Sequence, residues 1–248
     1  MSGPALDHAA EPAPPEVSFV IPAHDEARLI GATLDALRAA ADAAALRYEI
    51  VVVDDASTDD TAAIARACGA RVLPVAHRQI AATRNAGARA ARGARLVFVD
   101  ADTLIGAEVL RAAMRALDAG AVGGGAAVTL AGRMTRSERL LVGVLQRAFR
   151  RTGIAPGCFV FCTRAAFEAV GGFDQAWYAG EDVAISRALA RHGRFVILRE
   201  SVRTSNRKLR RHGTLEHLSL VLRFALHGRR ILRSRDALPL WYGPRRDE

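Results

Sequence analysis

The first half of the chain alternates short, continuously apolar runs with stretches of helical periodicity, and this alternation limits the folds that it can adopt. We expect strands at 17–21 (ended by Pro22), 49–53, 71–75 and 96–99. We expect helices at 26–45, 57–68, 79–92 and 106–119, the second of them capped by Ser57 or Thr58. Strands that are apolar throughout belong to a sheet covered on both faces. The prediction is an α/β fold with a mostly parallel central sheet, Rossmann-like in its first half and flanked by helices.

Three of these strands end in acidic residues: Asp25 with Glu26, Asp54 with Asp55, and Asp100 with Asp102. In open parallel sheets, ligands bind at the carboxyl ends of the strands. Asp100 and Asp102 are two residues apart, so on an extended segment they point to the same side and could bind one divalent cation that carries a diphosphate. Asp54 or Asp55 either accepts hydrogen bonds from a nucleobase or ribose, or caps the following helix.

The segment after the first strand, PAHDE at 22–26, contains neither GxGxxG nor GxxxxGK[ST]. This counts against a dinucleotide-dependent dehydrogenase and against a P-loop NTPase. The chain has no GxSxG elbow either, which argues against a hydrolase of the α/β type.

The amino-acid composition limits the kinds of ligand and partner that we expect for this protein. The formal net charge is +9, which favours an anionic ligand or surface. Aromatic residues make up only 6% and are not interleaved with the basic ones, so we expect no nucleic acid. The three cysteines form no CxxC pair, which indicates reduced thiols in a cytoplasmic protein. No apolar run approaches the ~20 residues that span a bilayer.

The second half is expected to continue with strands at 122–130, 157–163 and 195–198 and helices at 135–151 and 180–192. Residues 1–16, rich in Ala and Pro, are predicted to be a disordered tail. The main domain is assigned to 17–212, and 213–248 to a basic amphipathic helix and tail. The apolar face of that helix either packs on the domain or lies on anionic lipid, at the inner face of the cell membrane.

Several motifs together resemble those of the family-2 glycosyltransferases with the GT-A fold, of the small bacterial, non-processive type. They are VSFVIPAHDE at 17–26, EIVVVDDASTDDT at 49–61, RNAG at 84–87, FVDADT at 98–103, GGFD at 171–174 and GEDV at 180–183. The resemblance covers about residues 17–212. The chain lacks the QxxRW motif of processive synthases, which favours transfer of a single sugar.

The resemblance implies a role for each matching residue. The donor, a nucleotide-diphosphate sugar, would be bound by Pro22, His24, Glu26, Val53, Asp55, Arg84, Asp100, Ala101 and Arg207. His24 stands where the family often has Tyr. Asp102 would bind Mg²⁺ or Mn²⁺, Asp182 would be the catalytic base, and Gly157 and Glu181 would lie on the acceptor side. His212 or His217 could supply a further metal ligand.

The resemblance implies an inverting hexosyltransferase whose acceptor, a small molecule or a lipid-linked one, is not identified. A carboxylate must take the proton of the attacking hydroxyl, and Asp182 comes from a different segment from the metal ligand. Alternatively, Glu181 and Asp182 merely favour the N-terminus of their helix. Rival functions are a nucleotidyltransferase of the same fold, a non-catalytic nucleotide-sugar-binding protein and, from the net charge of +9, a nucleic-acid binder.

Overall fold

The computed structural model describes residues 13–130, 143, 147, 149 and 151–205. Its elements in chain order are β1 (Val17–Ala23), α1 (Ala27–Ala43), β2 (Tyr48–Asp55), α2 (Thr61–Ala67), β3 (Arg71–Val75), α3 (Ile80–Ala90), β4 (Arg95–Val99), β5 (Thr103–Leu104), α4 (Ala107–Asp118), β6 (Gly123–Leu130), β7 (Phe159–Thr163), α6 (Arg164–Ala169), α7 (Glu181–His192) and β8 (Phe195–Thr204). The sequence did not predict β5, and it ended β8 six residues too early.

The strands form one eight-stranded sheet in the order β3-β2-β1-β4-β7-β6-β8-β5. The first four strands of that order are parallel to one another. β7 runs antiparallel to both of its neighbours, and β5 runs antiparallel to β8. The predicted α/β fold is therefore confirmed, but the sheet is mixed, because its second half inserts an antiparallel strand between β4 and β6.

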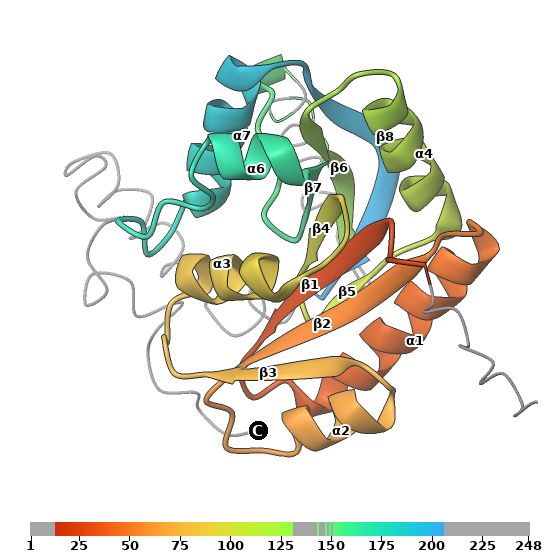
Figure 1. Ribbon diagram of the computed structural model, residues 1–248, viewed down its shortest axis with the longest axis vertical. Coiled ribbons are helices and arrows are strands. Elements are labelled where there is room, and N and C mark those ends of the chain that lie inside the picture. The colour runs from red at the N-terminus through yellow and green to blue at the C-terminus, as the bar shows by residue number, and fades with distance from the viewer. Residues whose placement is uncertain (1–12, 131–142, 144–146, 148, 150, 206–248) are drawn as a thin grey trace, which may run out of the picture.

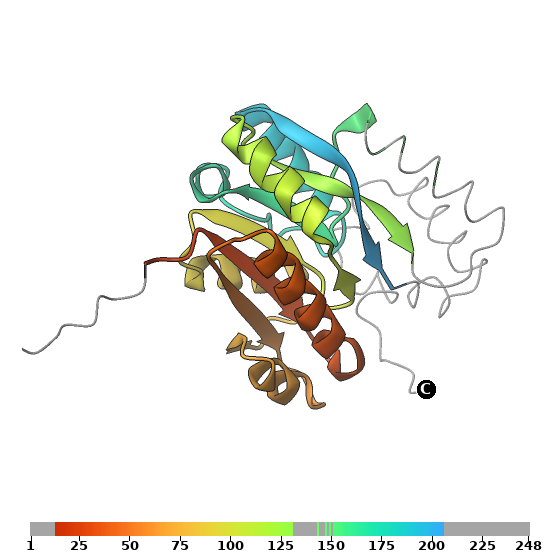
Figure 2. The ribbon, with the colours of Figure 1, turned by 90° about the vertical axis from the view of Figure 1, so that its right-hand side faces the viewer.

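Helices cover both faces of the sheet, and each face has its own hydrophobic core. α1, α2 and α4 lie on one face, and α3, α6 and α7 lie on the other (Figure 1). Side chains of β2 alternate between the two: Val52 joins the first core, whereas Val51 and Val53 join the second. Figure 2 shows α1 and α4 side by side over their face. Burial on both faces explains why the strands are apolar throughout.

Two local expectations are wrong. Pro22 does not end the first strand but lies within β1, beyond Val20, the last residue of β1 that pairs with β4. A proline is tolerated there because pairing on that side has already stopped. The second helix begins at Thr61, and neither Ser57 nor Thr58 caps it. These two residues bind Asp25 instead.

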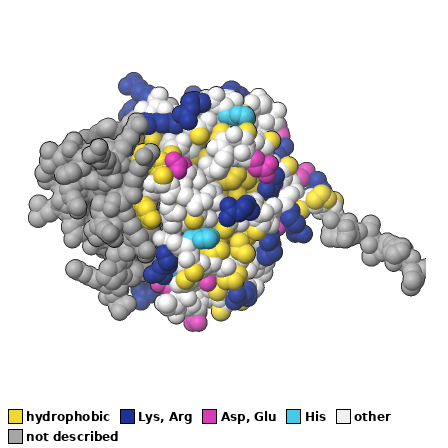
Figure 3. Space-filling view, turned by 60° about the vertical axis from the view of Figure 1, so that its left-hand side comes forward, with side chains coloured by type: hydrophobic (Ala, Val, Ile, Leu, Met, Phe, Trp, Pro, Cys, Tyr) yellow, Lys and Arg dark blue, Asp and Glu magenta, His cyan; other side chains and the backbone are white. Residues whose placement is uncertain are grey.

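Within the described residues, no helix combines the length and the apolar composition that a bilayer crossing requires. On the face in Figure 3, Arg side chains of the described residues are scattered among acidic and hydrophobic ones rather than gathered in a stripe. That face therefore adds no support for nucleic-acid binding. Some predictions fall outside the described residues. They concern most of the predicted tail, most of the helix at 135–151, and the segment from 206 onward, which contains Arg207, His212 and His217.

Candidate active site at the carboxyl ends of the strands

The three strands with acidic ends, β2, β1 and β4, are immediate neighbours in the sheet. Because they run parallel, their carboxyl ends meet at one edge. Asp54 and Asp55 are the last two residues of β2, Asp100 directly follows β4, and Asp25 and Glu26 come shortly after β1, so the predicted placement at adjacent strand ends is confirmed. The edge therefore gathers carboxylates from three segments, as the sequence pattern predicted.

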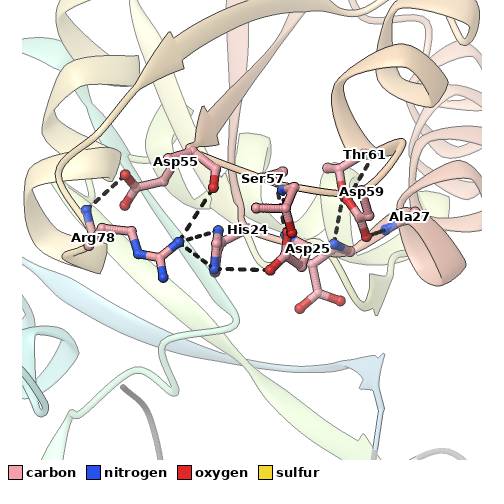
Figure 4. A network of polar contacts seen from close by, with 11 residues as sticks. His24, Asp25, Ala27, Asp55, Ser57, Asp59, Thr61 and Arg78 are labelled. Carbon is pink, nitrogen blue, oxygen red and sulfur yellow. Dashed lines mark hydrogen bonds and ion pairs between the residues drawn. The ribbon is translucent and has the colours of Figure 1, made fainter. Parts of the chain in front are cut away.

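Short hydrogen bonds connect the loop after β1 to the loop after β2 and to the first residue of α2 (Figure 4). The Asp25 N–H donates to Ser57 Oγ at 2.9 Å, and Asp25 Oδ1 accepts from the Thr58 N–H at 2.7 Å. The Glu26 N–H donates to Thr61 Oγ1 at 2.7 Å. These contacts satisfy backbone groups at the start of α1 and hold the two loops in register at the site.

Asp55 caps a helix, though not the one that follows it. Its Oδ1 accepts the Arg78 N–H at 2.8 Å, and its Oδ2 accepts the Gln79 N–H at 3.2 Å and the Thr83 hydroxyl at 2.8 Å. These donors belong to the N-terminus of α3, so Asp55 neutralises free N–H groups there. The carboxylate is buried, and both oxygens already accept hydrogen bonds. Its contact with a nucleobase or ribose stays a prediction.

Arg78 is a site residue that the sequence reading missed. Its Nη1 lies 2.8 Å from His24 Nε2, which in turn lies 3.2 Å from Asp25 Oδ2 (Figure 4). Arg78, Asp25 and Ala56 all have left-handed backbones, with φ of 51°, 49° and 57°. Non-glycine residues seldom adopt this conformation, and such strain often gathers at ligand sites. The one available signal was a basic residue just before the third helix.

Arg84 of α3 is buried, with 2% of its side chain exposed, and it joins three separate segments. Its Nη1 donates to Glu181 Oε1 at 2.8 Å. Its Nη2 donates to Asp100 Oδ1 and to the Gly157 carbonyl, both at 2.8 Å. The guanidinium carbon also lies 5.2 Å from the centre of the Phe173 ring. Burial lowers the pKa of Arg84, but the Asp100 and Glu181 carboxylates outweigh it and raise the pKa above its ordinary value, so Arg84 stays charged. Because its side chain is almost completely buried, Arg84 exposes almost no surface for the predicted direct contact with a donor.

The two acidic residues at the start of α7 differ in their surroundings. Glu181 is buried against Arg84, and burial raises its pKa to about 7. Asp182 is less enclosed: its Oδ2 accepts the Gly157 N–H at 3.0 Å, and its Oδ1 accepts the Val183 N–H at 2.8 Å. Burial raises the pKa of Asp182 as well, although Arg84 and the two N–H groups oppose it. A carboxylate with a raised pKa is a better proton acceptor.

Asp100 and Asp102 do not lie on an extended segment. The chain turns at Ala101 and Asp102, and the Thr103 N–H donates back to the Asp100 carbonyl at 3.1 Å. The prediction that both carboxylates point to one side assumed an extended segment, and that assumption is wrong. Asp100 binds Arg84, whereas Asp102 Oδ1 lies 3.3 Å from the Thr204 hydroxyl of β8. The turn is fixed from α1, where the buried Thr33 hydroxyl donates to the Ala101 carbonyl at 2.8 Å.

Three further predicted donor contacts, Pro22, Val53 and Ala101, have buried side chains. Val53 lies under α3 in the second hydrophobic core. Any donor contact from these residues would therefore use their backbone atoms. His24 and Glu26 are partly exposed at the site edge, as a direct contact requires.

A metal site made of protein ligands alone does not occur among the described residues, where no three His, Cys, Asp or Glu side chains are grouped to hold an ion. Mg²⁺ and Mn²⁺ prefer oxygen ligands, and Mg²⁺ commonly combines one or two carboxylates with substrate phosphates and water. The partly exposed Asp102 fits that arrangement. It would be the protein ligand, and a diphosphate would supply further oxygens.

The family model described as Glycosyl transferase family 2 matches residues 18–170. The chain belongs to this family. The match spans β1 to the end of α6 and so includes the three acidic strand ends, Arg84 and Gly157. No curated protein matches the chain.

Solved structures of glycosyltransferases share the fold. PcManGT, a mannosyltransferase from Pyrobaculum calidifontis in complex with GDP-Man and Mn²⁺, has a TM-score of 0.63 at 23% identity, over 92% of this chain and 73% of that one. S. aureus TarS 1-349 in complex with UDP-GlcNAc has a TM-score of 0.60 at 20% identity, over 77% of this chain and 58% of that one. The chain thus spans less than two thirds of that TarS structure.

A third structure is glucosyl-3-phosphoglycerate synthase from Mycobacterium tuberculosis in complex with Mn²⁺, UDP and glucosyl-3-phosphoglycerate. It has a TM-score of 0.57 at 18% identity, over 93% of this chain and 81% of that one. These likenesses confirm the predicted GT-A fold.

Proposed function

We propose that this chain transfers a single sugar, with inversion, from a nucleotide-diphosphate sugar to an acceptor hydroxyl. The observation that carries the proposal is the placement of Asp182. Asp182 lies at the start of α7 and accepts a hydrogen bond from the Gly157 N–H at 3.0 Å. The Gly157 carbonyl accepts a hydrogen bond from Arg84 Nη2, which also donates to Asp100 at the end of β4. A carboxylate from one segment thus lies beside the strand end expected to bind the donor, as an inverting transfer requires.

In the proposed mechanism, the oxygen of the acceptor hydroxyl attacks the anomeric carbon on the side opposite the leaving diphosphate. Asp182 takes the proton of that hydroxyl as the attack proceeds. General-base help of this kind contributes roughly 10²–10⁴-fold. His24 and Glu26 would bind the donor directly, and Pro22, Val53 and Ala101 would do so through their backbones. Asp55 would keep α3 in place while it meets the nucleoside. A bound Mg²⁺ or Mn²⁺ held by Asp102 would offset negative charge on the diphosphate.

The comparisons support the class of substrates. The matched structures are described with GDP-Man, UDP-GlcNAc or UDP bound, and two of them with Mn²⁺. The M. tuberculosis structure holds glucosyl-3-phosphoglycerate, a glycoside of a small acid. Small-molecule acceptors are therefore the first class to test, and lipid-linked acceptors the second.

A thermal-shift screen tests the proposal. The protein is heated with UDP, GDP, dTDP or CDP, each with Mn²⁺, with Mg²⁺ or with a chelator. A ligand that binds only the folded state raises the melting temperature. We expect one nucleotide to do so in a metal-dependent way, and its sugar conjugate to release nucleoside diphosphate on incubation. Binding without release would indicate a non-catalytic nucleotide-sugar-binding protein, and no shift with any nucleotide would refute the proposal.

A further inference from the structure

We propose that Arg84 is a positioning residue that couples the donor side of the site to the catalytic base, so that Asp182 is correctly placed only while Arg84 is bound to its partners. This inference rests on the proposed function for its kinetic consequence, but its structural part can be tested without any substrate. It assigns to Arg84 an action through other residues in place of the direct donor contact that the family resemblance implied.

Arg84 joins partners that lie far apart along the chain. Asp100, Gly157 and Glu181 lie 16, 73 and 97 residues from it along the chain. They belong to the end of β4, the turn before β7 and the first turn of α7. A planar guanidinium has five N–H donors in a fixed fork, so it can hold several acceptors at set angles. Each of these three hydrogen bonds measures 2.8 Å.

Arg84 is connected to Asp182 through Gly157 and through Glu181. Gly157 accepts from Arg84 through its carbonyl and donates to Asp182 Oδ2 through its own N–H. Glu181, the other partner, immediately precedes Asp182 on α7. A Cβ at position 157 would lie 3.1 Å from Asp182 Oδ2, so the glycine permits this close approach. Asp182 is therefore tied to Arg84 by two short routes.

Helix α3 is anchored at both ends by contacts that do not involve Arg84. Asp55 binds the N-terminus of α3, as described above. At the other end, the Arg164 guanidinium donates to the carbonyls of Ala88, Ala91 and Gly93 at 2.8–3.1 Å. Loss of Arg84 should therefore leave α3 in place. It would remove the positive charge between Asp100 and Glu181, so that either the two carboxylates repel each other or Glu181 takes up a proton.

Three variants separate positioning from general stabilisation. Arg84→Met keeps length but removes every donor, and Arg84→Lys keeps the charge but loses the fork. Arg164→Met is the matched control, because it deletes three guanidinium hydrogen bonds at the C-terminal end of α3 and touches no residue of the site. Each variant is studied at a temperature where its unfolding curve shows it fully folded.

Hydrogen exchange provides the substrate-free measurement. The amides of Gly157 and Val183 are the two donors to Asp182, so their exchange rates report whether the carboxylate keeps its place. We expect both rates to rise at least about tenfold in Arg84→Met, less in Arg84→Lys, and not at all in Arg164→Met. Unchanged rates at Gly157 and Val183 in folded Arg84→Met, or in folded Arg84→Lys if the former does not fold, would overturn the coupling.

Kinetics provide the second measurement. UDP-glucose, UDP-GlcNAc and GDP-mannose are each tested with Mn²⁺ for release of nucleoside diphosphate in a single turnover, with water taking the sugar in place of the unidentified acceptor. Misplacement of a catalytic group by about 1 Å can cost roughly 100-fold, so we expect a loss of that size in Arg84→Met. Nucleoside diphosphate affinity should change less than about tenfold, because the donor-side loops of β1 and β2 are intact. Equal losses in Arg84→Met and Arg164→Met would overturn the positioning role.

The two measurements fail separately. If the exchange rates rise as expected while the wild-type protein releases no nucleoside diphosphate from any donor, the coupling is supported and the proposed function is refuted.

Discussion

The side-chain amide of Asn85 makes a reciprocal pair of hydrogen bonds with the backbone of Phe173: its Nδ2 donates to the Phe173 carbonyl at 2.8 Å, and its Oδ1 accepts the Phe173 N–H at 2.9 Å. The buried Asn85 side chain thus satisfies both backbone groups of Phe173, as a neighbouring strand would do in a sheet. The pairing fixes the Phe173 ring beneath Arg84, the residue before Asn85. Consecutive residues of α3 therefore hold both the charged cluster and the loop that leads to α7.

Asn85→Ala should destabilise the fold by about 2–4 kcal/mol, because it leaves two buried backbone groups of Phe173 without partners. Urea unfolding measures the loss. Gln79→Ala is the control, since the Gln79 amide binds the same loop through the Gln175 carbonyl but lies at the exposed surface. It should cost less than about 1 kcal/mol, and equal losses in the two variants would contradict this account.

How far the sequence could predict this site depends on whether each contact is local. A carboxylate directly after an apolar run is visible in the sequence, and the meeting of Asp25, Asp55 and Asp100 at one sheet edge follows from parallel strands. The use of each carboxylate is not visible. Asp55 caps α3 through donors 23 to 28 residues away, so only tertiary packing decides between a helix cap and a ligand contact.

The same limit applies to strand direction and to Arg84. An apolar run such as β7 looks alike in parallel and antiparallel strands, so the mixed sheet could not be predicted from it. For Arg84, a signal existed: positions 81–88 form a helix of small residues with one long cation, and all eight are buried. A charged residue within a fully buried stretch of helix must find acidic partners. The sequence could not say that these are Asp100 and Glu181.

Gly87 shows how closely α3 packs on the sheet. A Cβ there would collide with Val20 Cγ1 and lie 2.7 Å from Val53 Cγ2. Gly87→Ala should therefore destabilise by about 1–3 kcal/mol, despite the better helix propensity of alanine. Gly31→Ala on α1 is the control, because its nearest neighbour, Ile64 Cγ2, would lie at 3.6 Å. Thermal unfolding should show Gly31→Ala neutral or up to about 1 kcal/mol more stable. A stabilising Gly87→Ala would disprove the packing argument.

The pH dependence of stability should reflect Glu49, which links β1, β3 and the end of α3. Burial raises its pKa, but hydrogen bonds from Ser18, the Arg92 N–H and Arg71 outweigh this, so the pKa lies below its ordinary value. The stabilisation is then present above the unfolded-state pKa of about 4.3 and is lost as the pH falls through the folded-state pKa. Glu49→Gln should be less stable than wild type near neutral pH, with a difference that shrinks below about pH 4.

Urea unfolding from about pH 7 to about pH 3 measures this difference. Glu168→Gln is the control, because the Glu168 side chain is 64% exposed and lies 3.7 Å from Arg164. Its effect should be small throughout. A Glu49→Gln difference that stays constant down to the lowest pH would show that the charge of Glu49 is not what stabilises the fold.

Asp102 and Asp182 should separate donor binding from chemistry. Asp102→Ala removes the proposed metal ligand, so nucleoside diphosphate binding should lose its dependence on Mn²⁺. Asp182→Asn keeps an oxygen that can accept the Gly157 N–H but cannot take a proton, so binding should persist while turnover falls roughly 10²–10⁴-fold. Calorimetric titration and donor cleavage measure the two effects, with Asp118→Asn, an exposed residue bound to Arg95, as the control for charge loss. Wild-type turnover in Asp182→Asn would remove the base from the mechanism, and undiminished metal-dependent binding in Asp102→Ala would remove the metal ligand.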